Sequence, residues 1–314
     1  MLVYTARRLL AVIPTILGVM FLSFIIIHAV PGNPGQVALG LTAPPKAVRA
    51  FDRQLGLDRP LFEQFLIYIK HLATLQFGDS ISLQTPVKGA IASHAGETIG
   101  LVLYVLVIAV SVAIPMSIYA ATHRDGIVDH CVRVLGVLTF AMPAFWLGLL
   151  LVLTFALKFR WFPVSGYGQG FEEQVRSLTL PAVTLAIGLA PLYIRTLRSS
   201  LISNLDASYI EAARSRGFSE RRVLYRHVLR PSLTSLITLV GLTTGLLISS
   251  AVIVEVVFAL NGLGTILVNG VGARDFPLVQ GLVFVIGTAV VLINFLTDLA
   301  YAVVDPRVRL RARQ

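Results

Sequence analysis

The stretch YIEAARSRGFSERRVLYRHVLRP, residues 209–231, carries six arginines, yet it lies between two apolar runs. A hydrocarbon core of roughly 30 Å needs about 20 helical residues at about 1.5 Å each, and both runs approach that length. Burying isolated charges in lipid is costly, so the stretch between them belongs in water at the membrane surface. It therefore predicts a polytopic membrane protein with a structured loop outside the bilayer.

The composition of the whole chain supports this class. Apolar residues make up 56% of the 314 residues, charged residues 13%, and the mean hydropathy is +0.81. Soluble domains are about 45–50% apolar and about 25% charged. The net charge of +10 would suit nucleic-acid binding only if the basic residues formed a patch on a soluble surface. Here the basic residues instead lie in the segments that flank and connect the apolar runs. The single cysteine, Cys131, rules out an intrachain disulfide and a multi-cysteine metal site.

Six apolar runs are candidate transmembrane helices, so the expected fold is all-α. The fourth run is the weakest, because it has 17 residues and contains Pro181 and Pro191. Membrane helices tolerate proline where neighbouring helices satisfy the freed carbonyls. In the fifth run, Gly241 and Gly245 form a G-x-x-x-G face that favours close helix contact. The expected spans are residues 9–30, 98–120, 134–157, 178–194, 233–258 and 278–304.

The distribution of lysine and arginine predicts the orientation. Six spans place both termini on one side, together with residues 121–133 and 195–232. That side holds 16 basic residues, against 4 in the two short loops of the opposite side. Segment 31–97 is left out of the comparison, because long loops translocate largely regardless of charge. Both termini and the opening stretch are therefore expected in the cytoplasm.

Segment 31–97 is patterned as a small helical cap on the outer side. Two or three short helices are expected, because apolar residues recur at helical spacing in two successive stretches. Two interpretations stay open: a lid that packs on the chain's own spans, or a surface for an external partner or incoming substrate. The apolar positions are Val48, Phe51 and Leu55, then Leu61, Phe65, Ile69 and Leu72.

The cytoplasmic loop, residues 195–232, predicts two short amphipathic helices joined by a glycine turn. Ser203, Asn204 and Asp206 are candidate N-caps for the first helix, and Gly217 is a suitable stop. Leu205, Tyr209, Ile210 and Ala213 would share one face of this helix, and Ala212 with Ala213 would let another protein approach closely.

The second short helix is expected to begin at Ser219 and to end before Pro231. Three interpretations of the pair of helices compete. A basic loop lying on anionic lipid is the plain one. A DNA-binding helix-turn-helix is disfavoured, because a loop tethered between two spans could hardly reach a major groove. A rigid lever that inserts into a cytoplasmic partner best explains the caps, the turn glycine and the apolar face together.

Glu211-Ala212-Ala213 followed by Gly217 resembles the EAA loop of ABC-importer permeases. The resemblance runs nearly end to end, and six further stretches look like the dipeptide, oligopeptide and nickel branch of that family. These stretches are ARRLLAVIPTILGVMFLSFIIIHAVPGNP (6–34), LGLDRPLFEQF (55–65), AMPAFWLGLLLVL (141–153), FPVSGYG (162–168), RDFPLVQG (274–281) and LTDLAYAVVDPRVR (296–309).

The resemblance implies a type I importer fold in the bacterial plasma (inner) membrane, with this chain as half of a pseudo-symmetric pair. The implied partners are a second permease subunit, one or two cytoplasmic ABC ATPases that bind ATP and Mg, an extracytoplasmic substrate-binding protein and membrane lipid. Each ATPase would hold the EAA-loop helix of one permease in a surface groove. The implied ATPase-docking residues are Tyr209, Ile210, Glu211, Ala212, Ala213, Arg214, Ser215, Arg216, Gly217 and Phe218. Glu211 is expected to cap local backbone N–H groups or to pair with a nearby arginine.

Two positions depart from the usual pattern of the family. Relatives place Ile-x-Leu-Pro ten residues after the glycine, whereas this chain has His227-Val228-Leu229-Arg230 there and proline one place later, at Pro231. The outer loop has NGLG (261–264) where many relatives have PGLG. The first departure bears on how rigidly the second short helix enters the fifth span, and the second bears on the outer mouth.

Few charged residues lie inside the expected spans, and Glu255 and Asp298 are the only acids there. Either Glu255 lines the outer gate or meets a cationic substrate terminus, or both acids are hydrogen-bonded or ion-paired near an interface. Pro143 is expected to kink the third span and to turn apolar and aromatic side chains towards a central cavity, although such side chains are more often core. The candidate pathway residues are Met142, Phe145, Trp146, Ser249 and Glu255, and no metal site is expected.

The sequence favours the non-hydrolytic membrane subunit of an ATP-driven importer, for di- or oligopeptides. It contains no G-x-x-x-x-G-K-[ST] phosphate-binding loop. Nickel or another small solute remains an alternative cargo. An ion-coupled secondary carrier and a membrane scaffold are alternatives of other classes, and the carrier would call for an inverted repeat that is not evident.

Replacing Gly217 by valine is expected to abolish uptake while the protein still reaches the membrane, because the turn must be stiff and compact to pass force. Uptake by cells and the amount of protein in membranes are the two measurements. Normal uptake by Gly217→Val cells would remove the lever from this account.

Overall fold

The computed structural model of the chain describes residues 2–29, 34–40, 42–54, 56, 58–124, 126, 130, 134, 136, 138–139 and 142–304. Within these residues the regular secondary structure is helical, apart from an isolated β-bridge between Asp79 and Pro86. The expected all-α class is confirmed. Four helical segments in the described part of the chain are long and apolar enough to cross a membrane: Val87–Thr122, Phe171–Leu205, Glu220–Val257 and Phe276–Thr297.

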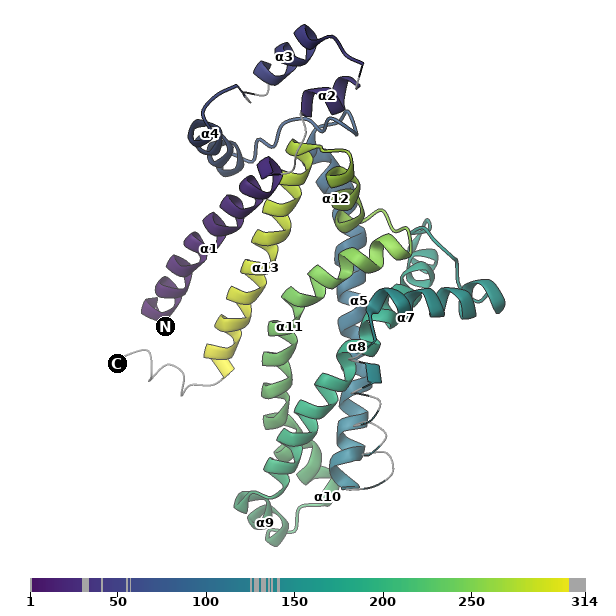
Figure 1. Cartoon of the computed structure of the whole chain (residues 1–314). Helices are drawn as coiled ribbons and strands as arrows, with labels where there is room; N and C mark the ends of the chain where they lie inside the picture. Colours follow the sequence, from purple (N-terminus) through teal and green to yellow (C-terminus); the bar gives the residue numbers. More distant parts are fainter. Residues whose placement is uncertain are drawn as a thin grey trace. The chain divides into compact units, whose positions relative to one another are not determined.

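The helices form two compact units, unit 1 with residues up to 98 and 261–295, and unit 2 with residues 99–260 and those from 296 onward (Figure 1). Unit 1 contains α1 (Leu2–Ala29), α2 (Pro34–Leu39), α3 (Pro45–Gln54), α4 (Leu61–Ala73), the start of α5 (Val87–Thr122), α12 (Leu263–Gly272) and most of α13 (Phe276–Val304). Unit 2 contains the rest of α5, α7 (Ala144–Leu151), the π-helix η1 (Val152–Lys158), α8 (Phe171–Leu205), α9 (Ser208–Ser215), α10 (Glu220–Arg222), the π-helix η2 (Val223–Leu229) and α11 (Arg230–Val257).

The expected spans correspond to helices, with informative differences in length. The fourth span is much longer than the sequence suggested, because α8 runs through both Pro181 and Pro191 without a break. α1 covers the first expected span as far as Ala29, and Val30 lies outside the described residues. The third span is described only in part, and Pro143 begins its helix α7 as an N-cap with extended backbone instead of kinking it.

The connection 259–277, one of the two short loops expected on the side opposite the termini, contains helix α12. The Thr98 hydroxyl oxygen accepts a hydrogen bond (2.8 Å) from the backbone N–H of Leu263, the first residue of α12. Helix starts leave such N–H groups without intrahelical partners. A side chain 165 positions away in the sequence therefore stabilises this helix, which local sequence cannot reveal.

Unit 1 confirms three short helices in segment 31–97, and one of them packs on the first long helix. Phe24 of α1 lies against Phe65 and Tyr68 of α4, with ring centroids 5.3 and 5.9 Å apart. The hydroxyls of Ser23 and Tyr68 are hydrogen-bonded at 2.9 Å. Met20 and Leu72 complete this buried cluster. The lid interpretation is therefore supported for α4.

Asp275 is a fully buried carboxylate that ties the segment after α4 to the start of α13. Its Oδ2 accepts hydrogen bonds from the Ser80 hydroxyl (2.5 Å) and from the N–H and hydroxyl of Ser82 (2.8 and 2.7 Å). Its Oδ1 accepts the N–H of Leu278, so Asp275 is also the N-cap of α13. Charge-assisted hydrogen bonds of this kind are about twice as strong as neutral ones.

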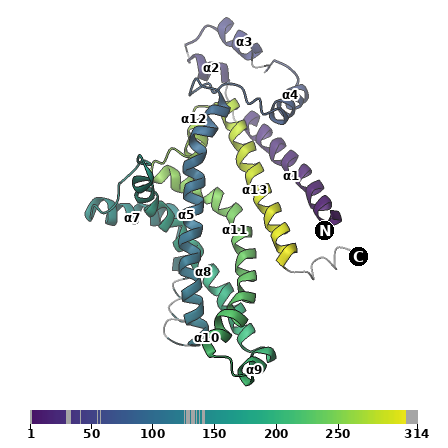
Figure 2. The same ribbon diagram turned by 180° about the vertical axis from the view of Figure 1, so that it is seen from behind.

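Unit 2 is held by close contact among its long helices, and α8 runs beside α11 (Figure 2). The Tyr193 hydroxyl of α8 is 2.7 Å from Thr243 Oγ1 of α11. A side chain at Gly241 would collide with Thr297 of α13, so the G-x-x-x-G face does make the expected close helix contact. These contacts fix α8 and α11 as one support for the loop that joins them.

Replacing Asp275 by alanine is expected to destabilise the protein by about 2–4 kcal/mol, because four donors lose a buried charged acceptor. Thermal unfolding of the purified protein in detergent measures the effect as a lower midpoint. Asp79→Ala removes an exposed carboxylate from the same segment and is the matched control, with an unchanged midpoint. Equal midpoints for both variants would contradict the assignment.

Candidate functional site

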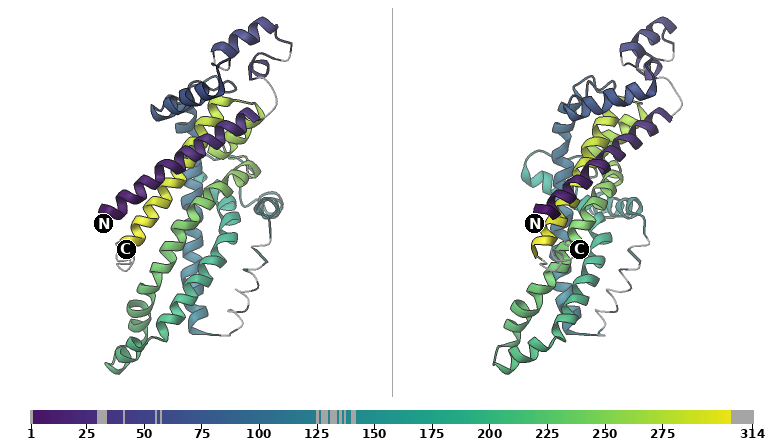
Figure 3. Two further views of the ribbon diagram at one scale, coloured as in Figure 1. Left: turned by 60° about the vertical axis from the view of Figure 1, so that its left-hand side comes forward. Right: turned by 90° about the vertical axis from the view of Figure 1, so that its left-hand side faces the viewer.

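The candidate site is the loop between α8 and α11, which Figure 3 shows as the bend that carries α9. α8 continues through Leu205 and ends at Asp206, and α9 begins after Ala207, whose side chain makes no capping bond. The expectation that Ser203, Asn204 or Asp206 caps α9 is therefore wrong. The polar atoms of Asn204 and Asp206 bond elsewhere in the fold, Asn204 to Ser232 and Asp206 to Arg124, so neither is free to cap α9.

Gly217 ends α9 as the sequence predicts. Its φ of +78° is left-handed, and its N–H donates to the carbonyl of Arg214 while the N–H of Phe218 donates to that of Ala213. This pair of bonds defines a Schellman motif, in which glycine follows the last helical residues. No atom lies within 4 Å of a Cβ built on Gly217. The requirement for glycine therefore comes from the backbone conformation alone.

The two faces of α9 differ in what they offer to a partner. Ile210 and Ala213 are buried, so in this conformation they support the helix instead of presenting a surface. The outer face consists of Ser208, Glu211, Ala212 and Ser215, and all four are exposed. The sequence predicted that Ala212 and Ala213 would both form a small surface open to a partner. Only Ala212 is exposed in this way, because Ala213 is buried.

Glu211 lies in the first turn of α9, where its negative charge favours the positive end of the helix dipole. Among the described residues its carboxylate makes no hydrogen bond or ion pair. The arginine pairing expected for Glu211 is instead made by Glu220, which binds Arg214. Glu211 remains available on the outer face.

The second half of the loop does not end before Pro231, contrary to expectation. One helical segment runs from Glu220 to Val257, so α10, η2 and α11 follow one another without a break. Proline lacks an N–H and crowds the carbonyl four residues earlier, here that of His227. The wider π-helical turn of η2 comes just before Pro231 and accommodates it. The departure noted in the sequence therefore gives a continuous rod into the fifth span.

Phe218 anchors the turn to that rod. Its ring stacks on His227 of η2 with centroids 5.7 Å apart, and the Arg222 guanidinium lies over the ring at 4.8 Å. An aromatic ring in contact with another ring and a cation gains from both interactions. The residue after Gly217 is therefore held against the start of the rod.

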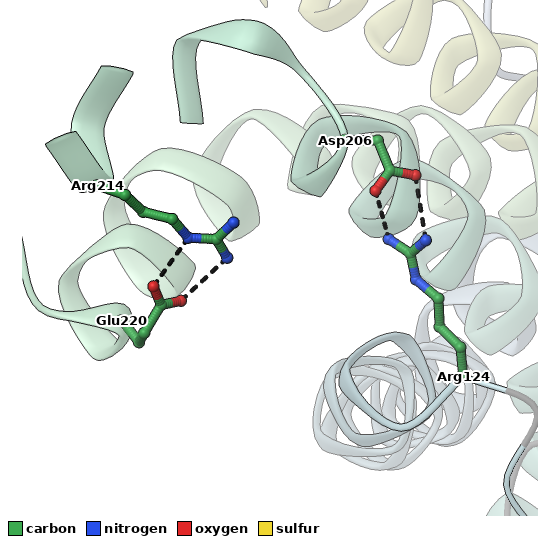
Figure 4. A network of polar contacts seen from close by, with 4 residues as sticks. All are labelled: Arg124, Asp206, Arg214 and Glu220. Atoms are coloured by element: carbon green, nitrogen blue, oxygen red, sulfur yellow. Dashed lines mark hydrogen bonds and ion pairs between the residues drawn. The ribbon is translucent and has the colours of Figure 1, made fainter. Parts of the chain in front are cut away.

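Two ion pairs tie the loop together (Figure 4). The Arg214 Nε and Nη2 atoms donate to the two carboxylate oxygens of Glu220 at 2.8 and 3.1 Å. Arg124, after α5, donates to both oxygens of Asp206 at 2.7 and 3.2 Å. The arginine hydrogen bonds hold the pKa of Asp206 and of Glu220 below their ordinary values. Since the groups are exposed, the pairs orient the loop more than they stabilise the fold.

The remaining docking residues, Arg214, Ser215 and Arg216, lie at the exposed end of α9 before the glycine. Tyr209 is exposed at 46%, but its hydroxyl is turned toward its own chain. The ten residues that the sequence singled out are thus contiguous in space. Sequence reasoning missed the role of five residues in holding α9 in place, although it had considered one of them, Asn204, as an N-cap. These residues are Arg124, Asn204, Glu220, His227 and Ser232. Two signals of these contacts were present in the sequence. Glu220 follows Arg214 by six positions and has the opposite charge, and Pro231 lacks a backbone N–H donor.

The candidate pathway residues lie in different environments. Met142 borders a cavity of about 200 Å³ shared with Thr184 and Ser250, while Phe145 and Trp146 are exposed on α7. Ser249 is also exposed.

Glu255, by contrast, is fully buried within the chain at 0% exposure, which favours the structural interpretation over an outer gate. The side chain of Asp298 lies outside the described residues. Among the described residues no group of three or more His, Cys, Asp and Glu side chains could hold a metal ion.

Comparison with known families identifies the chain. A model of the inner membrane component of binding-protein-dependent transport systems matches residues 113–310, and a model of the N-terminal part of such components matches residues 1–113. The chain belongs to this family. It is therefore the permease component of an ABC importer and a multi-pass protein of the inner membrane, and its family works with an ATPase and a substrate-binding protein.

Individual relatives of this permease cover its whole length. A protein of Brucella abortus named as a peptide transport system permease is 38% identical over 96% of this chain and 98% of its own. The dipeptide transport system permease DppB of Alkalihalophilus pseudofirmus is 32% identical over 98% of this chain and 100% of its own. A chain from the solved inward-facing MetNI methionine ABC transporter aligns with 70% of this chain and 94% of its own, at a TM-score of 0.49 and 19% identity.

The Arg214–Glu220 pair makes the mobility of the permease loop depend on pH. Glu220 has a lowered pKa in the folded loop, so the pair's contribution is complete above its ordinary value of 4.5 and is lost as the pH falls through the lowered value. A spin label at Ser215→Cys, in a Cys131→Ser background, is expected to be equally mobile at pH 7 and 5.5 and to become more mobile only as the pH falls well below 4.5.

In the Glu220→Gln variant the same label is expected to be mobile already at pH 7, with no acid transition. Glu211→Gln is the matched control, because it removes a carboxylate outside the pair and leaves the transition in place. A transition that survives in Glu220→Gln would contradict this assignment.

Proposed function

We propose that this permease is the membrane subunit of an importer for di- or oligopeptides, and that α9 docks on a separate ABC ATPase. The relatives named for peptide or dipeptide transport match nearly the entire chain, and this supports the cargo. The exposed outer face of α9, on a helix held from three directions, supports the docking role. The glycine turn at Gly217 closes the C-terminal end of α9. Phe218, the next residue, stacks on His227, and Glu220 forms an ion pair with Arg214 in the last turn of α9.

The remaining assignments follow the same proposal. Both termini and the α9 loop face the cytoplasm, because basic residues concentrate on that side. The six spans form half of the translocation pathway, and a second permease subunit supplies the other half. A substrate-binding protein delivers cargo on the outer side, where residues 31–97 lie. ATP and Mg bind to the ATPase, and this chain contributes no hydrolytic group.

The docking surface is small, so the rigidity of α9 is more important for transmitting force than the area that the contact buries. Four exposed side chains on about two turns of helix bury a few hundred Å2 at most, or several kcal/mol at roughly 25 cal/mol per Å2 before association costs. A contact of this size transmits force only if the helix does not tilt or slide on its own support.

Purification of the tagged permease from membranes in mild detergent tests the docking role. The wild type is expected to bring down an ABC ATPase and a second permease, whereas an ion-coupled carrier would come alone. Ala212→Trp places a bulky side chain on the outer face of α9 and is expected to lower ATPase recovery at least about tenfold. Ala73→Trp, at an exposed alanine at the end of α4, is the matched control and keeps full recovery.

Uptake by cells with labelled dialanine and with labelled nickel tests the cargo. Peptide uptake that depends on the intact gene supports the proposal, and uptake of nickel alone would assign the permease to the metal-carrying members of the branch. Full ATPase recovery with Ala212→Trp would overturn the docking role without affecting the cargo.

A further inference from the structure

A continuous chain of hydrogen bonds begins at Tyr209 of α9 and ends inside the rod that leads to α11. The Tyr209 hydroxyl donates to Asn204 Oδ1 at 2.9 Å. The Asn204 amide donates one hydrogen to Ser232 Oγ and the other to the carbonyl of Ser200, both at 2.9 Å. The Ser232 hydroxyl then donates to the carbonyl of Val228 at 2.8 Å.

Every donor in this chain has an acceptor, and this fixes its direction. A flipped Asn204 amide would turn its oxygen toward the carbonyl of Ser200, an acceptor, so only the orientation described satisfies both ends. Ser232 is fully buried, and there an unpaired hydroxyl would be costly. Fully satisfied buried networks rigidify the elements that they join. Here those elements are α9, the end of α8 and the start of α11.

The Tyr209 hydroxyl also lies 3.3 Å from the carbonyl oxygen of His227. In an α-helix that carbonyl would accept the N–H at position 231, which Pro231 lacks. Tyr209 therefore reaches the π-helical turn η2 at a position four residues before Pro231. A side chain from α9 thus contacts the rod where its regular α-helical pairing changes.

We propose that Tyr209 is a positioning residue that locks α9 to both α8 and α11 through Asn204 and Ser232, so that a push on α9 moves the two membrane helices as one body. The inference rests on the proposed docking of an ATPase on α9. It goes beyond that docking. The exposed face of α9 receives the displacement from the ATPase, and the inference assigns to Tyr209 the transmission of this displacement to the membrane helices.

The test follows amide hydrogen exchange in the purified permease–ATPase complex in nanodiscs, with and without ATP and vanadate. In the wild type, nucleotide is expected to slow exchange in residues 208–216 and to change exchange in residues 233–257. Tyr209→Phe removes one hydroxyl and keeps the ring. We expect the response of residues 208–216 to remain, because the hydroxyl bonds within the chain and not on the outer face of α9, while the response of residues 233–257 falls at least about threefold.

Two further variants define the outcome. Asn204→Asp keeps an acceptor for Tyr209 but cannot donate to both Ser200 and Ser232, so it is expected to reproduce the loss. Tyr225→Phe removes the hydroxyl of an exposed tyrosine in η2 and is the matched control, with a wild-type response.

A wild-type response of residues 233–257 in Tyr209→Phe overturns the inference and leaves the docking role standing. An equal loss of response in both segments overturns it too, because the hydroxyl would then serve only the local fold of α9. Absence of an ATPase from the wild-type preparation would instead overturn the proposed function.

Discussion

The proposed coupling role requires that α9 move the membrane helices through contacts that do not bend, and the loop between α8 and α11 meets that requirement. Its turn is closed by a left-handed glycine with two backbone hydrogen bonds. The next residue is clamped between a cation and an aromatic ring. The rod beyond continues without a break into the fifth span. Each of these features restricts a different movement of the loop.

The proline at position 231 shows how such stiffness is reached through an apparent defect. A proline inside a helix removes one donor and crowds the preceding turn. The π-helical turn before it gives the ring room, and the Tyr209 hydroxyl approaches the carbonyl of His227, four residues before the proline. The position of this proline, one place later than in the usual pattern of the family, is thus matched by compensating contacts from α9.

The sequence predicted those parts of the permease that depend on local pattern. Apolar runs located the long helices, and Gly217 marked the end of α9, because a left-handed backbone favours glycine wherever it occurs. Predictions failed where a distant contact decides. Asp206 bonds to Arg124, 82 positions away, and Asn204 bonds to Ser232, so neither caps α9. Glu255 is buried in the chain itself, which the span pattern alone could not distinguish from a pathway position.

Site-directed cross-linking tests the central claim most directly. Single cysteines along α9, in a Cys131→Ser background, would be joined to the ATPase in membranes by a short cysteine-to-lysine cross-linker. The account predicts cross-links from positions 208, 211, 212 and 215, which form the exposed face, and none from 210 and 213, which are buried. Cross-links from the buried positions, or an outer face that reaches no ATPase in an assembled complex, would contradict it.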